Sequence, residues 1–383
     1  MPFRSGRIEW QPIDAFYFTS QQKTVILLKS IFVMDKNPHH IFFTKEKAAF
    51  SKLLTDGNFS KFFLLTDENC ARHCLPVFKN IFPQQPIDEI FTVPAGEDSK
   101  NLETAQKLWE KMMTYGDRQS LLINLGGGMI SDLGGFVASL FKRGIAFVNI
   151  PTSLLAMVDA SIGGKTAVNF KAVKNQIGCF SNPYAVYIDS TFLKTLAHRE
   201  LKSGFAEMIK IALAASRELF CQLSDIENLD KEIDELMIRN AALLKMEIVE
   251  SDPMEKGKRT LLNLGHTAGH AFESYSARHD VLPLTHGEAV AQGILCEALI
   301  AVEQKQLQDD DFETIKELIF RFFDKYNFGI GALDEILNLM IYDKKNRNGK
   351  INFTLPFGIG DALINRFASA EEIKKALQKY LEL

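Results

Sequence analysis

Hydrophobic and polar positions alternate in two different ways along the chain. In the first half, short apolar runs are separated by amphipathic stretches of helix length. The runs typical of buried strands are residues 61–66, 120–125, 146–151 and 185–189. Helical stretches lie between them, for example 101–115 and 130–140. Strands that alternate with helices predict a largely parallel sheet with right-handed crossovers, so a Rossmann-like α/β fold is expected.

From Glu200 onward the helical period dominates. The helices predicted there are residues 202–216, 232–251, 266–275, 287–304 and 311–326, and two late strands are expected near 351–356 and 362–367. Asp309, Asp310 and Asp311 open the last of these helices, where acidic residues favour a helix N-terminus. The pattern predicts an α/β domain over residues 1–197 and a mainly α-helical domain over 198–383.

Composition narrows the class of protein. The chain has 383 residues, which suits about two domains, and 46% of them are hydrophobic. Its net charge of −4 argues against a protein that coats nucleic acid or an anionic membrane. No run approaches the roughly 18 apolar residues of a membrane span; the nearest, 24–34, is interrupted by Lys29 and Ser30 and predicts strands. We expect a cytoplasmic protein, because its start lacks an apolar signal core and its five cysteines are scattered.

Three glycines, Gly126, Gly127 and Gly128, follow the apolar run 120–125 and precede a predicted helix. Glycine permits a tight turn and lets a phosphate approach the backbone at a helix N-terminus. The dinucleotide fingerprint fits at Gly126 and Gly128 but has Ser131 at its third glycine position. The turn is thus equally compatible with a dinucleotide site and a structural turn. Asp67, at the end of an earlier strand, is a candidate ribose partner, or a helix cap, or both.

Residues 141–175 form a cationic stretch in an acidic protein. Five basic residues stand there against one acid, Asp159; they are Lys142, Arg143, Lys165, Lys171 and Lys174. A solvated face is the ordinary explanation for a basic run. Because Lys165 and Lys174 lie among small and apolar residues, we favour lysines directed into a pocket for a small anion.

Histidine spacing indicates a metal site. His266 and His270 are four residues apart and share one face of a predicted helix, and His286 follows. Two histidines with a distant carboxylate and an open position are a common arrangement for a divalent metal. Glu207 is a candidate for the carboxylate, with Lys210 three residues further on the same face. Spacing alone leaves open which two histidines bind, and core or capping histidines are the alternative.

These segments together resemble the dehydroquinate synthases of the sugar phosphate cyclase family. The resemblance rests on the motifs GGGMISDLGGF, RGIAFVNIPTSLLAMVDASIGGKTAVN, KNQIG, GFAEMIK, LLNLGHTAGHAFE and HGEAV. It extends from about Asp67 to Asn346, whereas the first 60 residues match poorly and are expected to form edge strands.

The resemblance implies roles for individual residues. The metal, zinc or cobalt, would be held by Glu207, His266 and His286, and His270 would belong to the catalytic surroundings. NAD would contact Asp67, Asn69, Glu97, Lys100, Gly127, Gly128, Asp132, Thr152 and Ser153. The substrate would contact Arg143, Asp159, Lys165, Lys174, Asn175, Lys210, Lys245, Arg259, Asn263 and His270. Lys344 or Lys345 would complete the phosphate site.

The family's reaction suits such groups. A deoxy-arabino-heptulosonate 7-phosphate is transiently oxidised by NAD, loses phosphate, is reduced again and closes by an intramolecular aldol step to 3-dehydroquinate, in the shikimate pathway. The resemblance therefore implies a carbon–oxygen lyase, a small anionic sugar-acid phosphate as substrate, and a homodimer. The alternatives are another cyclase of the family, making an inosose, a valiolone or an amino analogue, and a metal-dependent NAD polyol dehydrogenase. The intact GGKT and KNQIG segments favour the carboxylate-bearing substrate.

Overall fold

The computed structural model describes residues 40–171, 173–341 and 350–383. These described residues form one compact unit. The strands expected within 24–34 lie outside the described residues, as do Lys344 and Lys345. The division into two domains after residue 197 stays a prediction.

A six-stranded sheet organises the first half, and every strand pair in it is parallel, as the alternation predicts. In the order of the sheet its strands are β1 (Ile41–Phe43), β8 (Ala185–Ile188), β5 (Ala146–Pro151), β4 (Leu121–Gly126), β2 (Phe62–Asp67) and β3 (Glu89–Val93). The four central strands were predicted within one residue. The expectation of an edge strand among the first 60 residues is confirmed by β1, while β3, at the other edge, was missed because its residues alternate in exposure.

The central strands are mainly apolar because both faces of the sheet are covered. In β4, Leu121, Ile123 and Leu125 belong to one hydrophobic cluster, while Leu122 belongs to another on the opposite face. Successive side chains of a strand point to opposite faces, so a strand with two covered faces needs apolar residues at nearly every position. Each fully buried side chain of this size contributes about 1.5–3 kcal/mol.

Helices and short turns connect these strands. They are α2 (Lys47–Asp56), α3 (Glu68–His73), α4 (Leu75–Ile81), α5 (Leu102–Tyr115) and α6 (Gly128–Leu140), with η2 (Thr44–Glu46), η3 (Glu97–Ser99), η4 (Phe141–Arg143), the π-helical turn η5 (Ala156–Ala160) and η6 (Ser190–Thr195). Helix α5 begins where predicted, because Asn101 caps it by accepting from the Thr104 amide (2.8 Å).

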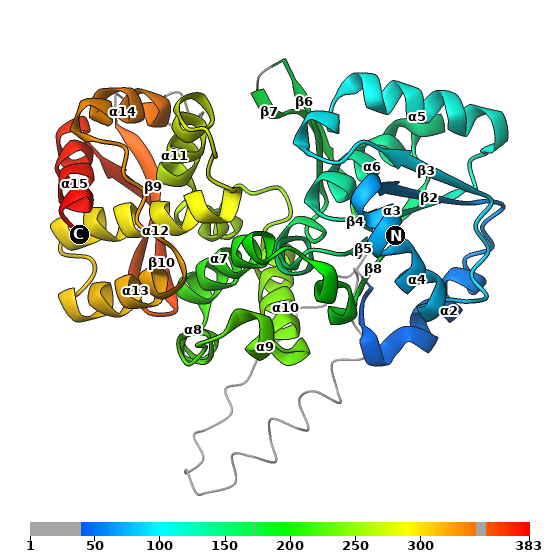
Figure 1. Cartoon of the computed structure of the whole chain (residues 1–383), viewed down its shortest axis with the longest axis horizontal. Helices are drawn as coiled ribbons and strands as arrows, with labels where there is room; N and C mark the ends of the chain where they lie inside the picture. The colour runs from blue at the N-terminus through cyan, green and yellow to red at the C-terminus, as the bar shows by residue number, and fades with distance from the viewer. Residues whose placement is uncertain (1–39, 172, 342–349) are drawn as a thin grey trace, which may run out of the picture. The chain divides into compact units, whose positions relative to one another are not determined.

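An antiparallel hairpin of β6 (Lys165–Phe170) and β7 (Val173–Phe180) stands apart from the sheet and is visible near the top of Figure 1. It carries three of the five basic residues of the cationic stretch, Lys165, Lys171 and Lys174. The hydrophobic pattern did not predict it, because β7 is largely exposed and only Ile177 and Cys179 of this strand pack, partly buried, against the core.

The second half is mainly helical, as predicted. Its elements are α7 (His198–Ala215), α8 (Arg217–Ser224), α9 (Leu229–Glu232), α10 (Glu235–Ser251), η7 (Lys258–Asn263), α11 (His266–His279), α12 (His286–Glu303), α13 (Asp309–Phe322), η8 (Ile330–Ala332), α14 (Leu333–Ile341), β9 (Ile351–Gly358), β10 (Asp361–Ala368) and α15 (Ala370–Glu382). The expected helix start at 232 was wrong, because Asp234 caps α10 through the Met237 amide. The expected end at 326 was wrong too, since α13 stops at Phe322. No helix among the described residues is long and apolar enough to cross a membrane.

Helix α12 is the centre of this half. It packs against α11, α7, α13 and α15, and Figure 1 shows it, in yellow, between α11 and α13. The crossing with α11 is very close: a Cβ added at Gly293 would lie 2.0 Å from the Gly265 carbonyl oxygen. Gly265 itself has a φ of +76° immediately before His266. Both positions therefore require glycine, and together they fix where α11 begins.

A buried carboxylate on α12 completes this junction. Glu297 accepts hydrogen bonds from the backbone amides of Gly265 (2.6 Å) and Ala268 (3.1 Å). These amides belong to the first turn of α11, whose N–H groups have no partner within the helix. Glu297 thus holds the turn that carries His266.

We predict that Glu297→Ala lowers the free energy of unfolding by about 2–3 kcal/mol, because buried amides lose their acceptor. Urea unfolding measures the change. The matched control is Glu303→Ala on the same helix, whose lysine partners are exposed, and its effect should stay below about 1 kcal/mol. Equal effects of the two variants would contradict the capping role.

Candidate functional site

The glycine-rich turn leads from β4 into α6. Gly127 precedes the helix, and no side chain of the described residues caps its first N–H groups. Uncapped N–H groups give the helix start a partial positive charge, which suits a phosphate. Ser131, at the third fingerprint position, is buried, and its hydroxyl donates to the Gly127 carbonyl oxygen (3.2 Å). The serine is therefore accommodated inside the helix.

Polar residues predicted to contact NAD lie at the carboxyl ends of neighbouring parallel strands. Asp67 ends β2 and caps α3 through the amides of Asn69 (2.9 Å) and Cys70 (3.0 Å). Thr152 follows β5, and its Oγ1 lies 3.3 Å from Cys70 Sγ. Ligands of open α/β sheets bind outside such strand ends. The capping role of Asp67 is confirmed, and its role toward a ribose stays a prediction.

The same edge of the site holds an ion-pair group around the buried Lys100. Lys100 Nζ lies 2.7 Å from Glu97 Oε1 and 3.1 Å from Asp132 Oδ2. Burial raises the pKa of Asp132 to about 6, although Lys100 opposes the change. Burial would lower the pKa of Lys100, but Asp132 and Glu97 outweigh it and raise that pKa. The structure thus brings together three of the residues predicted to contact NAD.

A second group of charges is centred on Asp159 in η5. Its Oδ1 lies 2.7 Å from Lys245 Nζ and 3.5 Å from Lys210 Nζ. Burial would raise the pKa of Asp159, but the two lysines hold it well below its usual range. For Lys245 burial prevails and lowers the pKa to about 8, against the attraction of Asp159. These lysines come from α7 and α10, so tertiary packing assembles the group.

The metal-ligand candidates converge from three helices. Glu207 Oε1 on α7 lies 3.3 Å from His286 Nε2 on α12 and 3.7 Å from His266 Nε2 on α11. The ligand atoms of His266, His270 and His286 all lie within 4.8 Å of one another. The structure therefore gathers all four candidates, and which histidines bind a metal stays a prediction.

The charges around Glu207 suit a cation. Both of its carboxylate oxygens are fully buried and accept no hydrogen bond from the described residues, although Oε2 forms an ion pair with Lys210 Nζ. Burial would raise the pKa of Glu207, but Lys210 outweighs it and lowers the pKa to about 2. For His286, burial would lower the pKa, but the neighbouring carboxylates of Glu207 and Glu273 outweigh it and raise the pKa to about 10. The space between Glu207 and His286 thus favours positive charge.

The hairpin lysines face carboxylates of the helical half. Lys165 Nζ lies 2.5 Å from Glu255 Oε2, and Lys174 Nζ lies 2.5 Å from Glu273 Oε1. Both lysine side chains are more than half exposed, at 51% and 57%. They therefore lie at the rim of the site, and their direction into an anion pocket stays a prediction.

The remaining substrate candidates differ in their surroundings. Arg259 is buried and donates to the carbonyl oxygens of Gly163 and Pro253 (2.8 Å each). Asn263 Nδ2 donates to Glu255 Oε1 (2.9 Å). The backbone N–H of Asn175 donates to Asn169 Oδ1 (2.9 Å). Arg143 is exposed in η4 with a φ of +73°. In the described part of the chain, no hydrogen bond or ion pair joins Arg143 to the other predicted site residues.

Sequence reasoning missed the carboxylates that contact these predicted residues. Glu273 contacts His286 and Lys174, and Glu255 contacts Lys165 and Asn263. Glu273 follows His266 by seven residues, so the helical period could have placed it on the histidine face. Glu255 lies in an irregular segment, where no period places a side chain.

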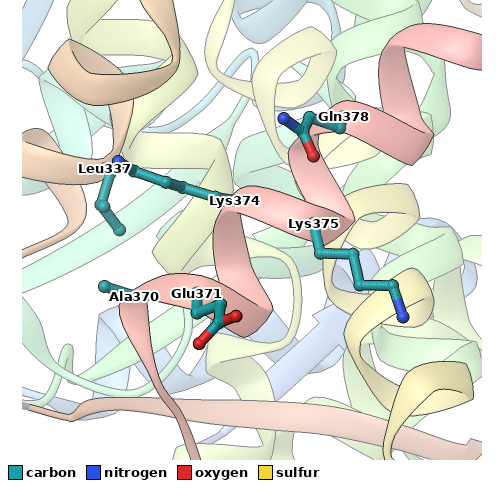
Figure 2. A pocket seen from close by; sticks show the side chains of 6 residues that line it. All are labelled: Leu337, Ala370, Glu371, Lys374, Lys375 and Gln378. Atoms are coloured by element: carbon teal, nitrogen blue, oxygen red, sulfur yellow. The ribbon is translucent and has the colours of Figure 1, made fainter.

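A separate hollow on α15 has no part in this group. It is lined by Leu337, Ala370, Glu371, Lys374, Lys375 and Gln378. Figure 2 shows Lys374 and Lys375 pointing to different sides of the helix. Lys374 pairs with Asp334 (2.6 Å) and Lys375 with Glu303 (2.5 Å), so both cations have carboxylate partners. None of the predicted site residues lines this hollow.

Known proteins support the family that the motifs indicate. Residues 90–203 match the family model of the 3-dehydroquinate synthase N-terminal region, and residues 204–346 match that of the C-terminal region. A 3-dehydroquinate synthase of Parabacteroides distasonis is 39% identical over 341 residues, which are 88% of this chain and 96% of that protein. The chain belongs to the 3-dehydroquinate synthase family.

Two solved structures of cyclases share the fold. A 2-epi-5-epi-valiolone synthase from Streptomyces hygroscopicus, with NAD⁺ and Zn²⁺ bound, is 25% identical with a TM-score of 0.78, covering 91% of this chain and 98% of that one. A 2-deoxy-scyllo-inosose synthase complexed with carbaglucose-6-phosphate, NAD⁺ and Co²⁺ is 23% identical with a TM-score of 0.77, covering 88% and 96%. The predicted fold class is confirmed.

We predict that Asp159→Asn destabilises the fold, because Lys210 and Lys245 would stay buried with one negative charge fewer. The expected loss in the free energy of unfolding is of order 3 kcal/mol, as for a broken buried ion pair. Urea unfolding measures it, with Asp230→Asn as control, because the Asp230–His198 pair is exposed. A loss no larger than that of the control would contradict the buried-pair interpretation.

Proposed function

We propose that this protein converts a deoxy-arabino-heptulosonate 7-phosphate into 3-dehydroquinate and phosphate, as a lyase that uses NAD and a divalent metal. Family membership supports the reaction. The observation that carries the metal dependence is the buried Glu207 carboxylate, whose oxygens lack hydrogen bonds from the described residues and lie beside His266 and His286. Carboxylate and imidazole are ordinary ligands of zinc.

The residues would divide into three roles. Glu207, His266 and His286 would hold the metal, with His270 next to them. The uncapped start of α6 and the polar ends of β2 and β5 would hold the dinucleotide. When bound, NAD supplies a hydride acceptor, and the metal supplies a Lewis acid that stabilises developing negative charge on oxygen.

The chain's own contribution is to bind and orient a substrate with a carboxylate and a phosphate. Lys210 and Lys245 are held by Asp159, so their ammonium groups have fixed positions before substrate arrives. Lys165 and Lys174 are exposed on a hairpin and are available to an anion. Charge-assisted hydrogen bonds from several cations restrict the pose of a dianionic ligand, which lowers the entropic cost of reaction. Arg143, Asn175, Arg259 and Asn263 are proposed to contribute to this binding.

Two alternatives stay testable. Cyclases that make an inosose or a valiolone share the fold, but their substrates lack the carboxylate that this many cations would recognise. A polyol dehydrogenase would transfer a hydride without releasing phosphate, and its neutral substrate needs no lysine cluster. A homodimer follows from the family resemblance and a cytoplasmic location from the sequence composition, and both stay predictions.

We predict phosphate release from the heptulosonate phosphate without net accumulation of NADH, because the hydride is returned within each turnover. A phosphate assay combined with NADH absorbance measures both, and removal of NAD or addition of a chelator should abolish release. Faster phosphate release from a sugar phosphate that lacks the carboxylate would favour another cyclase. Steady NADH formation with glycerol would favour a dehydrogenase.

We also predict that His266→Ala abolishes zinc binding and turnover while the protein stays folded, since His266 is at the start of α11 and is not part of its packing core. Zinc content of the purified protein and circular dichroism check the two outcomes. His279→Ala, on the same helix but exposed, is the control and should retain both zinc and activity. Full zinc content in His266→Ala would refute the assigned ligand set.

A further inference from the structure

Glu273 is a largely buried carboxylate to which none of the roles above is assigned. It lies on α11, seven residues after His266, and its side chain is 13% exposed. Its Oε2 lies 3.2 Å from His286 Nδ1, and its Oε1 lies 2.5 Å from Lys174 Nζ. Its two oxygens therefore contact residues from two different elements, α12 and β7.

The contact with His286 decides which nitrogen of that ring is free. When Nδ1 donates its proton to Glu273, Nε2 is the nitrogen left to bind a cation in place of a proton, and it faces Glu207 at 3.3 Å. Carboxylates that accept the second N–H of a metal-bound histidine fix its tautomer and make it a better ligand. Glu273 thus orients His286 for a cation shared with Glu207.

The contact with Lys174 joins the helical half to the hairpin of the α/β half. Lys174 lies on the hairpin, on the exposed strand β7, and in the described residues it has no other ion pair with a carboxylate. An ammonium group has three donors, and Glu273 accepts one of them. Two donors therefore remain for an anion while the side chain is held toward the histidines.

We propose that Glu273 is a positioning residue that couples the metal centre to the anion-binding hairpin, by holding His286 with one oxygen and Lys174 with the other. The inference rests on the proposed function and on the proposed ligand set. It goes beyond them in one respect: a single carboxylate sets both metal affinity and substrate affinity. Loss of its charge should then weaken both together.

The first test compares Glu273→Gln with the unchanged enzyme. Zinc affinity, measured by competition with a chelator, should fall by about ten- to a hundredfold, the usual effect of removing such a partner. Glu335→Gln is the matched control, because Glu335 pairs with His279 of the same helix at 3.0 Å, away from the histidine group. Unchanged zinc affinity in a folded Glu273→Gln would overturn the proposal. If that variant does not fold, Glu273→Asp, which keeps the charge but is one methylene shorter, should show the same direction of change.

The second test asks whether Glu273 positions Lys174 for the substrate or competes with the substrate for Lys174. At saturating zinc, Glu273→Gln should raise the KM for the heptulosonate phosphate more than it lowers kcat, because Lys174 loses its support. Lys174→Ala should raise KM and leave zinc affinity unchanged. In the Lys174→Ala background, Glu273→Gln should raise KM no further. A lower KM in Glu273→Gln would show that Glu273 competes with substrate for Lys174, and would overturn the proposal, as would independent, multiplicative effects in the double variant.

Failure of the inference differs from failure of the proposed function. If His266→Ala loses zinc and Glu273→Gln keeps it, the ligand set holds and only the role of Glu273 falls. If His266→Ala keeps zinc, the ligand set itself falls.

Discussion

A buried group of alternating charges, Glu207, Lys210, Asp159 and Lys245, is the interaction on which the site depends. Isolated charges removed from water cost several kcal/mol each, so each must lie against an opposite one. Glu207 and Lys210 come from α7, Asp159 from η5 and Lys245 from α10. These elements pack so that the four charges meet. That requirement fixes the position of the Glu207 carboxylate, toward which the histidines converge.

The position of the histidines depends on the crossing of α11 and α12. Gly293 allows the two backbones to approach, and Glu297 satisfies the first amides of α11. His266 begins α11 and His286 begins α12, so each histidine sits at a helix end that packing has already fixed. Rotamers held by rigid elements keep ligand geometry better than those on loops. Glu273 adds a contact from this rigid pair to the hairpin.

In the α/β half, the ends of parallel strands position the site residues. Because the strands are parallel, the residues that follow β2, β4 and β5 meet at one edge, and Asp67, Gly127 and Thr152 are gathered there. The cationic hairpin β6–β7 is the exception, since its lysines are exposed and reach their partners only across to the helical half. The α/β half thus contributes to the candidate site in two ways, through rigid strand ends and through an exposed hairpin.

The pattern of apolar and polar residues was enough to predict the central strands and the histidine face from the sequence. Burial on both faces makes β4 and β5 largely apolar runs, and the helical period places His266 and His270 on one face. The capping of α10 by Asp234 and the edge strand β3 were missed, because a cap and a half-exposed strand leave little hydrophobic signal. The motifs identified the family, which periodicity alone could not do.

Residue types and their periods along the chain already indicate a parallel sheet, a helical half, a glycine turn and a set of histidines and lysines. Tertiary structure alone decided which of them meet. Asp159 and Lys245 are 86 residues apart, as Lys174 and Glu273 are 99 apart, and both pairs form contacts. Spacing carries no information over such distances, because the turns between the elements set their relative positions. The partners of Lys165 and Lys174, and the double contact of Glu273, therefore became visible only in the folded chain.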